Sequence, residues 1–262
     1  MHEGPDYVRV KPCRYGRMIY NVNDLYIGRS LDLYGEYSEG EVDVFRQILR
    51  PGDVALDVGA NIGVHTLPMA RMVGECGAVM AFEAQRTAYQ TLCGNVALNG
   101  LLNVWCRNVA VGDSPGSTII VPVLNPERPN NFGGLALGKY AAGDRIPVVR
   151  LDDNPPQACR LIKVDVEGME LQVLRGAAGL IERFRPILYV ENDKAEKSAE
   201  LIRYIDSLGY DLYWHRPPLF NPQNYLAHGE NVFGDVLSHN MLCVHRGSTG
   251  KLEGFPRVDV PE

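Results

Sequence analysis

The sequence predicts an α/β fold with a mostly parallel sheet, one antiparallel strand and helices on both faces. Short apolar runs alternate with helix-like segments over most of the chain. In addition, the apolar run Val54–Val58 passes through a glycine-containing bend into a helical pattern that extends to about Met72. In α/β folds, a strand, a glycine bend and a helix N-terminus present free backbone N–H groups to a nucleotide-like ligand.

Length and composition are those of one decorated globular domain. The chain has 262 residues, of which 45% are apolar and 22% are charged. The formal net charge of -6 argues against a surface built to hold a polyanion, so we expect no nucleic-acid partner. The basic residues Arg9, Lys11, Arg14 and Arg17 are interpreted as a solvated face rather than a phosphate site.

The cysteines and the apolar runs bear on the cellular compartment. The six cysteines are scattered and form no C-x-x-C pair, so a zinc or disulfide role is not expected. We find no signal-peptide pattern and no apolar run long enough to cross a bilayer. The sequence therefore predicts a cytoplasmic location with reduced thiols and no membrane partner.

Residues 1–40 are expected to form an accessory segment or lid. Short strands are predicted at Val8–Val10 and Met18–Val22, with a third at Tyr26–Gly28. A helix is predicted at Glu39–Leu49, because its apolar residues recur on one helical face.

The core elements follow in order, the strands as apolar runs and the helices as segments with helical periodicity. Strands are expected at Val54–Val58, Gly77–Phe82, Val104–Val109, Leu161–Val166, Ile187–Val190, Tyr210–Trp214 and Met241–His245, the last antiparallel. Helices are expected at Gly63–Met72, Arg86–Leu98, Met169–Arg183 and Lys194–Leu208.

Two segments are read as decorations of this core. The stretch from Gly112 to Asp153 is rich in Pro, Gly and Asn, with strand-like pieces at Thr118–Val123 and Ile146–Leu151. We interpret it as a β-hairpin excursion with a mobile tip at Asn125–Gly134, which either helps to cover a substrate or is a solvent-exposed decoration. Residues 248–262 are expected to form a loose tail.

The bend after the first core strand has the pattern D-x-G-x-x-x-G. Gly59 and Gly63 are its glycines, and Ala60 and Asn61 stand between them, so it lacks the glycine-lined turn of dinucleotide-binding proteins. Asp57 precedes the first glycine, and a carboxylate there suits a ligand that carries a positive charge.

This combination resembles motif I of class I S-adenosylmethionine-dependent methyltransferases, and the string D-V-G-A-N-I-G-V-H-T is similar to the FkbM family. The resemblance is renewed at Ile162–Glu170 (I-K-V-D-V-E-G-M-E), Val173–Ala177 (V-L-R-G-A) and Pro186–Glu191 (P-I-L-Y-V-E). It covers roughly residues 34 to 246. It implies a Rossmann-like, seven-stranded class I methyltransferase sheet of order 3-2-1-4-5-7-6, a methyltransferase domain at residues 41–247, and S-adenosyl-L-methionine as cofactor.

Several residues are candidate contacts of that cofactor. Glu83 ends the second core strand, where a carboxylate accepts hydrogen bonds from both ribose hydroxyls. Asn61 and Thr66 can bind a carboxylate at the helix N-terminus. Asn108 and Ala110 fall where this fold usually meets the adenine ring.

In the resembled family, the Y-G-E-Y-S stretch leads into the cofactor site. Tyr37, Ser38 and Glu41 are therefore candidate lid contacts, or else only the first turn of a packing helix. His65 is interpreted as a packing or capping residue. The expected cofactor contacts are Tyr37, Glu41, Asp57, Gly59, Ala60, Asn61, Gly63, Thr66, Glu83, Asn108 and Ala110.

The acceptor chemistry points to carboxylates at strand ends, because a hydroxyl needs a base or a metal ion before it attacks a methyl group. Asp165, Glu191 and Asn192 resemble the set in metal-dependent catechol-type O-methyltransferases, and their oxygens suit Mg²⁺ or another divalent cation. Without a metal, Asp165 or Glu191 would orient the acceptor and His215 would act as the base. The structural alternatives are a helix cap for Glu167 and a loop hydrogen bond for His215.

The sequence therefore predicts an O-directed methyltransferase that acts on a saccharide or another small polyol or natural product. The Pro-stiffened loop His215–Tyr225 carries aromatic and amide side chains that suit a sugar ring. A nicotinamide-dependent oxidoreductase and a non-catalytic cofactor-binding protein are the alternatives, and N-methylation stays open. A homo-oligomer is compatible with the sequence.

Overall fold

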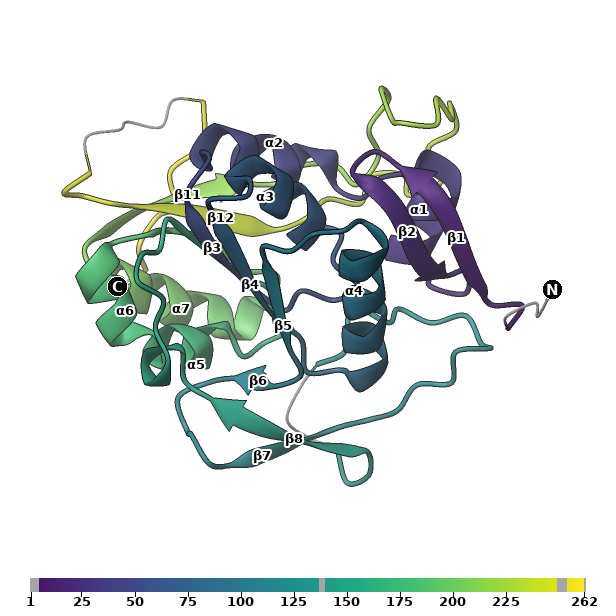
Figure 1. Ribbon diagram of the computed structural model, residues 1–262. Helices are drawn as coiled ribbons and strands as arrows, with labels where there is room; N and C mark the ends of the chain where they lie inside the picture. The colour runs from purple at the N-terminus through teal and green to yellow at the C-terminus, as the bar shows by residue number, and fades with distance from the viewer. Residues whose placement is uncertain (1–4, 137–139, 249–253, 262) are drawn as a thin grey trace.

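The structure, a computed structural model, describes residues 5–136, 140–248 and 254–261. At its centre lies a seven-stranded sheet in the order β11-β12-β10-β9-β3-β4-β5 (Figure 1). Its strands are β3 (Val54–Val58), β4 (Ala78–Phe82), β5 (Val104–Arg107), β9 (Leu161–Val164), β10 (Ile187–Glu191), β11 (Tyr210–His215) and β12 (Asn240–His245). β12 is antiparallel to β10 and β11, and the pairs from β10 to β5 are parallel. This confirms the predicted sheet and, with the core strands numbered along the chain, its order 3-2-1-4-5-7-6.

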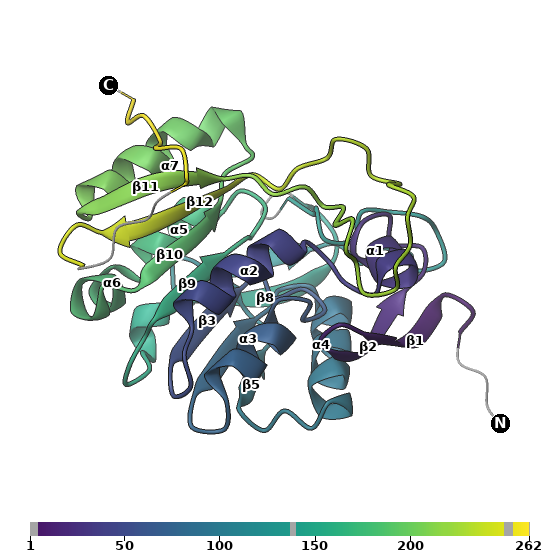
Figure 2. The same ribbon diagram turned by 90° about the horizontal axis from the view of Figure 1, so that it is seen from above.

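Helices cover both faces of the sheet (Figure 2). One face carries α2 (Glu39–Ile48), α3 (Thr66–Val73) and α4 (Arg86–Leu98), and the other carries α5 (Glu170–Arg175), α6 (Ala178–Phe184) and α7 (Ala195–Ser207). The helix predicted at Met169–Arg183 is thus interrupted. The interruption falls at Gly176, which packs so closely on another loop that a Cβ there would lie 2.1 Å from the carbonyl oxygen of Gly112. Within the described residues, no helix has the length and apolarity needed to cross a membrane.

The N-terminal segment is a β-hairpin followed by a helix. β1 (Val8–Cys13) pairs antiparallel with β2 (Gly16–Asn21), as predicted. The strand predicted at Tyr26–Gly28 is wrong, because α1 (Ile27–Tyr34) begins there. The Asp24 carboxylate accepts the N–H of Tyr26 at 3.0 Å, just before the first turn, and the helix buries residues at helical spacing, among them Ile27, Leu31 and Tyr34.

The central excursion forms a second, three-stranded sheet in the order β6-β8-β7. Its strands are β6 (Ala110–Val111), β7 (Thr118–Val121) and β8 (Asp144–Val149), and the 3-10 helix η1 (Leu151–Asp153) follows. The strand predicted to reach Val109 ends at Arg107, and the chain then enters this second sheet.

The predicted tip of the excursion, Asn125–Gly134, is held against the N-terminal segment. The N–H of Leu25 donates to the carbonyl of Asn130 at 3.0 Å, and the N–H of Asn130 donates to the carbonyl of Asn23 at 3.0 Å. These backbone bonds join two segments that the sequence analysis treated separately.

The C-terminal residues 254–261 do not form the loose tail predicted for residues 248–262. The N–H of Trp214 donates to the carbonyl of Pro256 at 2.8 Å, and the N–H of Val258 donates to that of Leu212 at 2.9 Å. The Val258 side chain is buried. The segment therefore continues the sheet at the free edge of β11, where backbone groups need partners. Residues 249–253 and 262 of the predicted tail lie outside the described residues.

Asn95 of α4 ties the N-terminal hairpin to the core. Its side chain is fully buried, at 0% exposure, and accepts the N–H of Ile19 at 2.6 Å. Its amide donates to the carbonyls of Ile19 at 3.1 Å and of Ile62 at 2.8 Å. One side chain thus fixes β2 and the bend after β3 to the same helix.

Asn95→Ala should lower the free energy of unfolding by about 3 kcal/mol, because buried backbone groups lose their partners. Asn99→Ala is the matched control. Asn99 makes the same pair of bonds to the backbone of Arg17 but is partly exposed, so its loss should cost about 1 kcal/mol. Urea denaturation measures both, and equal losses would contradict this account.

Candidate active site

A cavity of about 300 Å³ opens at the carboxyl ends of β3, β4, β9 and β10. Because these strands are parallel, the residues that follow them meet at one edge of the sheet. Other parts of the chain also contribute to the wall. Among them are residues between Tyr26 and Glu41, between Val109 and Val111, between Asn131 and Leu135, and between Val236 and Asn240.

The bend after β3 forms part of the cavity wall. Gly59 and Ala60 donate their N–H groups to the carbonyl of Phe82 at 2.9 and 3.0 Å, and both line the cavity. Asn61 has a left-handed backbone (φ 49°), and its side-chain oxygen accepts the N–H of Ile62 at 2.8 Å. The bend is therefore held by hydrogen bonds to the end of β4 and by one within itself, and Gly59, Ala60 and Asn61 line the cavity.

Asp57, Gly63 and Thr66 lie behind this wall rather than on it. The Asp57 carboxylate is 0% exposed, and the Thr66 hydroxyl donates to it at 2.6 Å. None of these three residues lines the cavity. Asp57 and Thr66, both predicted as cofactor contacts, are thus hydrogen-bonded to each other in the protein interior.

Glu83 follows β4 and lines the cavity. Its two carboxylate oxygens accept the N–H groups of Asn61 at 2.8 Å and of Gln85 at 2.7 Å. Burial raises the pKa of Glu83 to about 7, although these two N–H donors and the charge of Lys163 lower it. A carboxyl group with its oxygens on the wall is thus held at the predicted place.

Asn108 and Ala110, both predicted near an adenine ring, have different surroundings. Ala110 lines the cavity. The Asn108 side chain donates to the carbonyls of Glu83 at 2.8 Å and of Ala84 at 3.1 Å, and it does not line the cavity. It therefore supports the loop after β4.

A polar part of the wall consists of Tyr37, Glu41 at the start of α2, and His65 at the start of α3. Glu41 is 5% exposed, and it accepts the hydroxyl of Ser38 at 2.7 Å. His65 Nε2 lies 3.9 Å from Glu41 Oε2 and has no hydrogen-bond partner among the described residues. Burial lowers the pKa of His65 to about 4, so the imidazole is neutral at pH 7. The sequence analysis interpreted His65 only as a packing or capping residue.

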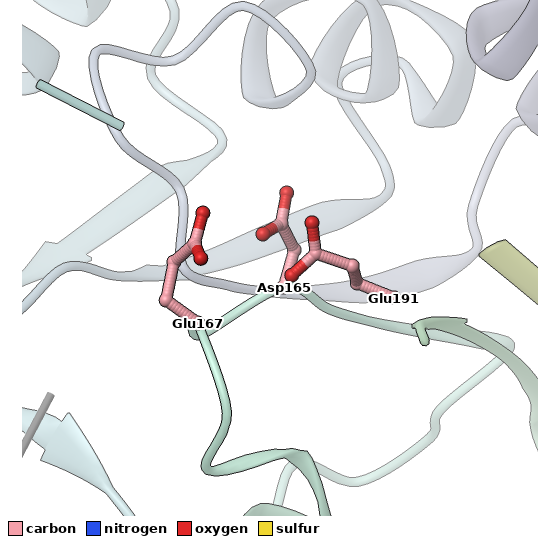
Figure 3. Close-up of side chains that lie close together, drawn as sticks. All are labelled: Asp165, Glu167 and Glu191. Carbon is pink, nitrogen blue, oxygen red and sulfur yellow. The ribbon is translucent and has the colours of Figure 1, made fainter. Parts of the chain in front are cut away.

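Three carboxylates converge on the cavity from β9 and β10 (Figure 3). Asp165, Glu167 and Glu191 can each offer one oxygen such that the three oxygens lie within 4.8 Å of one another. Glu191 Oε2 has no hydrogen-bond partner among the described residues, and burial, followed by the charge of Asp165, raises the pKa of Glu191 to about 11. Lys194 donates to Glu167 at 2.8 Å.

The structure does not bring Asn192 into this set. Its side-chain amide donates to the sulfur of Met241 at 3.3 Å, and it does not line the cavity. Glu167 lies in the set instead. The helix cap that the sequence offered as the alternative role of Glu167 is not formed: α5 begins after Met169 without a side-chain cap, and the Glu170 carboxylate accepts the N–H of Gly168, before the helix, at 2.8 Å.

His215, the predicted base, is placed away from the cavity. It ends β11, is not part of the cavity lining, and its Nδ1 lies 2.8 Å from the hydroxyl of Tyr189. Its ring also packs against those of Tyr189 and Phe255. This geometry corresponds to the structural alternative for His215, a hydrogen bond.

The sequence analysis missed Lys163, which lines the cavity with only 3% exposure. A signal was present, because a lysine within the apolar run Leu161–Val164 needs buried partners. It also missed the contributions of Leu135 and Val236–Asn240, for which the local sequence gave no signal.

A family model matches more than half of the chain. The family model described as the methyltransferase FkbM domain matches residues 57–212, which is more than half of the 262-residue chain. The match contains the bend after β3, Glu83 and the three converging carboxylates.

Methyltransferase sdnD of Sordaria araneosa is 31% identical over an alignment of 153 residues, covering 46% of this chain and 59% of that protein. The crystal structure of methyltransferase FkbM from Methylobacillus flagellatus KT is 21% identical, with a TM-score of 0.50 over 78% of this chain and 50% of that one. TYW2 of M. jannaschii in complex with AdoMet is 14% identical, with a TM-score of 0.47 over 98% and 90%. The chain spans less than two thirds of the first two proteins, and the structural likenesses concern the fold alone.

His215→Ala should lower the free energy of unfolding by about 1 kcal/mol, because the buried Tyr189 hydroxyl loses a partner. In a Tyr189→Phe background the same change should cost less, since no hydroxyl is left behind. Urea denaturation of the four proteins in this cycle gives the coupling. Additive losses would show that the Tyr189–His215 contact contributes nothing.

Proposed function

The chain belongs to the FkbM family of methyltransferases, and on that premise we propose that it transfers a methyl group from S-adenosylmethionine to a hydroxyl of a small acceptor. The acceptor class we propose is a saccharide or another small polyol or natural product. The observation that carries this proposal is the single cavity that joins Glu83 to the three strand-end carboxylates. Donor-binding and acceptor-activating groups would thus face one another across it.

Three features of the wall support the donor's binding mode. The Glu83 carboxylate is available to accept ribose hydroxyls in addition to its two N–H donors. Glu41 offers a carboxylate to the donor's ammonium group. The partnerless His65 Nε2, near the N-terminus of α3, is available to the donor's amino-acid end.

Methyl transfer is an in-line displacement, so the cavity must hold the acceptor oxygen opposite the sulfonium. The bond from sulfur to methyl breaks as the bond from oxygen to methyl forms, and the hydroxyl proton leaves to a base. We assign that role to Asp165, whose side chain is 37% exposed and therefore reachable. His215 lies outside the cavity and has no part in this step.

A divalent cation at the converging carboxylates is a second, separate proposal. Its support is the closeness of the oxygens of Asp165, Glu167 and Glu191, together with the partnerless Glu191 Oε2. All three are hard oxygen ligands of the kind that Mg²⁺ binds. A bound cation would lower the pKa of an acceptor hydroxyl.

The charge of the cavity supports a small acceptor without phosphate groups. Among the described lining residues, Lys163 is the only lysine or arginine, whereas Glu and Asp side chains are numerous. A nucleic-acid backbone would meet repulsion there. Accordingly, we propose a small-molecule acceptor and no nucleic-acid or membrane partner, in a cytoplasmic enzyme.

Family membership decides against the oxidoreductase alternative. The non-catalytic alternative would gain if Asp165, Glu191 and His215 were buried and mutually satisfied, with no open cleft. The cavity and the partnerless Glu191 oxygen weigh against it.

S-adenosylmethionine and S-adenosylhomocysteine should both bind the wild type in calorimetric titrations, and Glu83→Ala should weaken binding about tenfold or more. Glu75→Ala, outside the cavity lining, is the matched control. The proposed donor would be wrong if neither ligand bound.

Donor binding should depend on pH through Glu83. Ribose hydroxyls favour the ionised carboxylate, and with a pKa of about 7 that form is scarce at pH 6 and predominant above pH 7. Affinity should therefore rise several-fold between about pH 6 and about pH 7.5, approaching but not exceeding about tenfold. The rise should be absent in Glu83→Gln, and an equal rise in that variant would assign it to another group.

Mn²⁺, used as a probe, should bind the wild type in calorimetry and bind Glu191→Gln and Glu167→Gln more weakly, because each loses a carboxylate ligand. Asn192→Ala should bind like the wild type, since its amide contacts Met241 instead. Absence of Mn²⁺ binding to the wild type would refute the cation proposal and leave methyl transfer untouched.

A further inference from the structure

Lys163 is a buried cation in the cavity wall, between the bend after β3 and the carboxylate of Asp165. It lies on β9 directly opposite Asp57 of the neighbouring parallel strand β3. The two side chains therefore lie on the same face of the sheet, the face that carries α3. At 3% exposure, Lys163 has almost no contact with solvent.

Its ammonium group faces three oxygens, and an ammonium has three N–H donors to offer. Nζ donates to the carbonyl of Gly59 at 3.0 Å. It forms ion pairs with Asp57 Oδ1 at 3.4 Å and with Asp165 Oδ2 at 3.3 Å. The Gly59 oxygen belongs to the bend after β3, the Asp57 oxygen to the buried carboxylate behind that bend, and the Asp165 oxygen to the proposed base.

The contacts of Lys163 define its role. The carboxylates of Asp57 and Asp165 lie within ion-pair distance of Nζ, and the Gly59 carbonyl accepts a hydrogen bond from it. The ammonium is therefore engaged by its partners, so it is neither a nucleophile nor a base. Asp57 Oδ1, in turn, has no hydrogen-bond partner among the described residues, and this ion pair is its compensation.

We propose that Lys163 is a positioning residue for methyl transfer: it fixes the Gly59 carbonyl on the donor side and the Asp165 carboxylate on the acceptor side relative to one another. The inference rests on the proposed function. It goes beyond charge balance for Asp57, because two of its three partners line the cavity and Asp57 does not. The two roles can be separated by removing both buried charges.

The test compares Lys163→Met with the double variant Asp57→Asn/Lys163→Met. Lys163→Met keeps the volume of the side chain but leaves Asp57 buried without its cation, so thermal stability should fall. The double variant removes that unpaired charge, so most of the stability should return. Its affinity for S-adenosylmethionine should nevertheless stay about tenfold or more below that of the wild type, because Gly59 has lost its charged donor.

Lys11→Met is the matched control. Lys11 also donates to a backbone carbonyl and pairs with an aspartate, Asp32, but it lies on β1 outside the cavity lining. Its loss should leave donor affinity unchanged. If Lys163→Met does not fold, the double variant still gives the decisive measurement.

Two outcomes would overturn the inference, and they are distinguishable. If the folded double variant bound S-adenosylmethionine as tightly as the wild type, Lys163 would serve only to neutralise Asp57, and the proposed donor would still stand. Failure of the wild type to bind S-adenosylmethionine would instead overturn the proposed donor, and the inference with it. Recovered stability with lost affinity is the result that supports a positioning role.

Discussion

The close approach of Gly59 to the backbone of Asp165 is the constraint on which the site depends. Gly59 has a left-handed backbone (φ 82°), and a Cβ there would lie 1.7 Å from the carbonyl oxygen of Asp165. Only glycine allows the bend after β3 to rest on the end of β9. Because of this contact, the bend and the strand-end carboxylates line the same cavity, and the Lys163 ammonium contacts both Gly59 and Asp165.

The carboxylates of the cavity are concentrated there by topology. Parallel strands end at a common edge, so Glu83, Asp165 and Glu191, far apart in the chain, meet in space. Burial opposes the ionisation of Glu83 and Glu191, and it raises the pKa of Glu83 to about 7 and that of Glu191 to about 11. A cationic ligand would relieve this accumulation, and a sulfonium donor is such a ligand. The fold thus places several buried carboxylates close together, an arrangement that a positively charged ligand would stabilise.

The wall opposite the strand ends is built from segments outside the sheet. The loop between β11 and β12 runs along α1: the Tyr34 hydroxyl donates to the carbonyl of Glu230 at 2.8 Å (Figure 2). The central excursion reaches the segment just before α1, since the N–H of Leu25 donates to the carbonyl of Asn130 at 3.0 Å. An accessory segment, an insertion and a late loop therefore contribute walls to one cavity.

The sequence alone determined the strands of the central sheet and the position of Glu83, because hydrophobic periodicity and turn residues are local signals. The order of those strands followed from the family resemblance. The sequence analysis predicted a strand at Tyr26–Gly28, where a helix of only eight residues begins, too short to give a clear periodic pattern. It also predicted a loose tail for residues 254–261, which instead hydrogen-bond to β11. At the site, it identified Asp165 and Glu191 as strand-end carboxylates. Only the tertiary structure showed which residues lie near these carboxylates. Lys163 and Glu167 do, whereas the Asn192 side chain contacts Met241 and the His215 side chain contacts Tyr189. Which side chains meet depends on the register of strands and the approach of distant loops, and neither is written in any one segment.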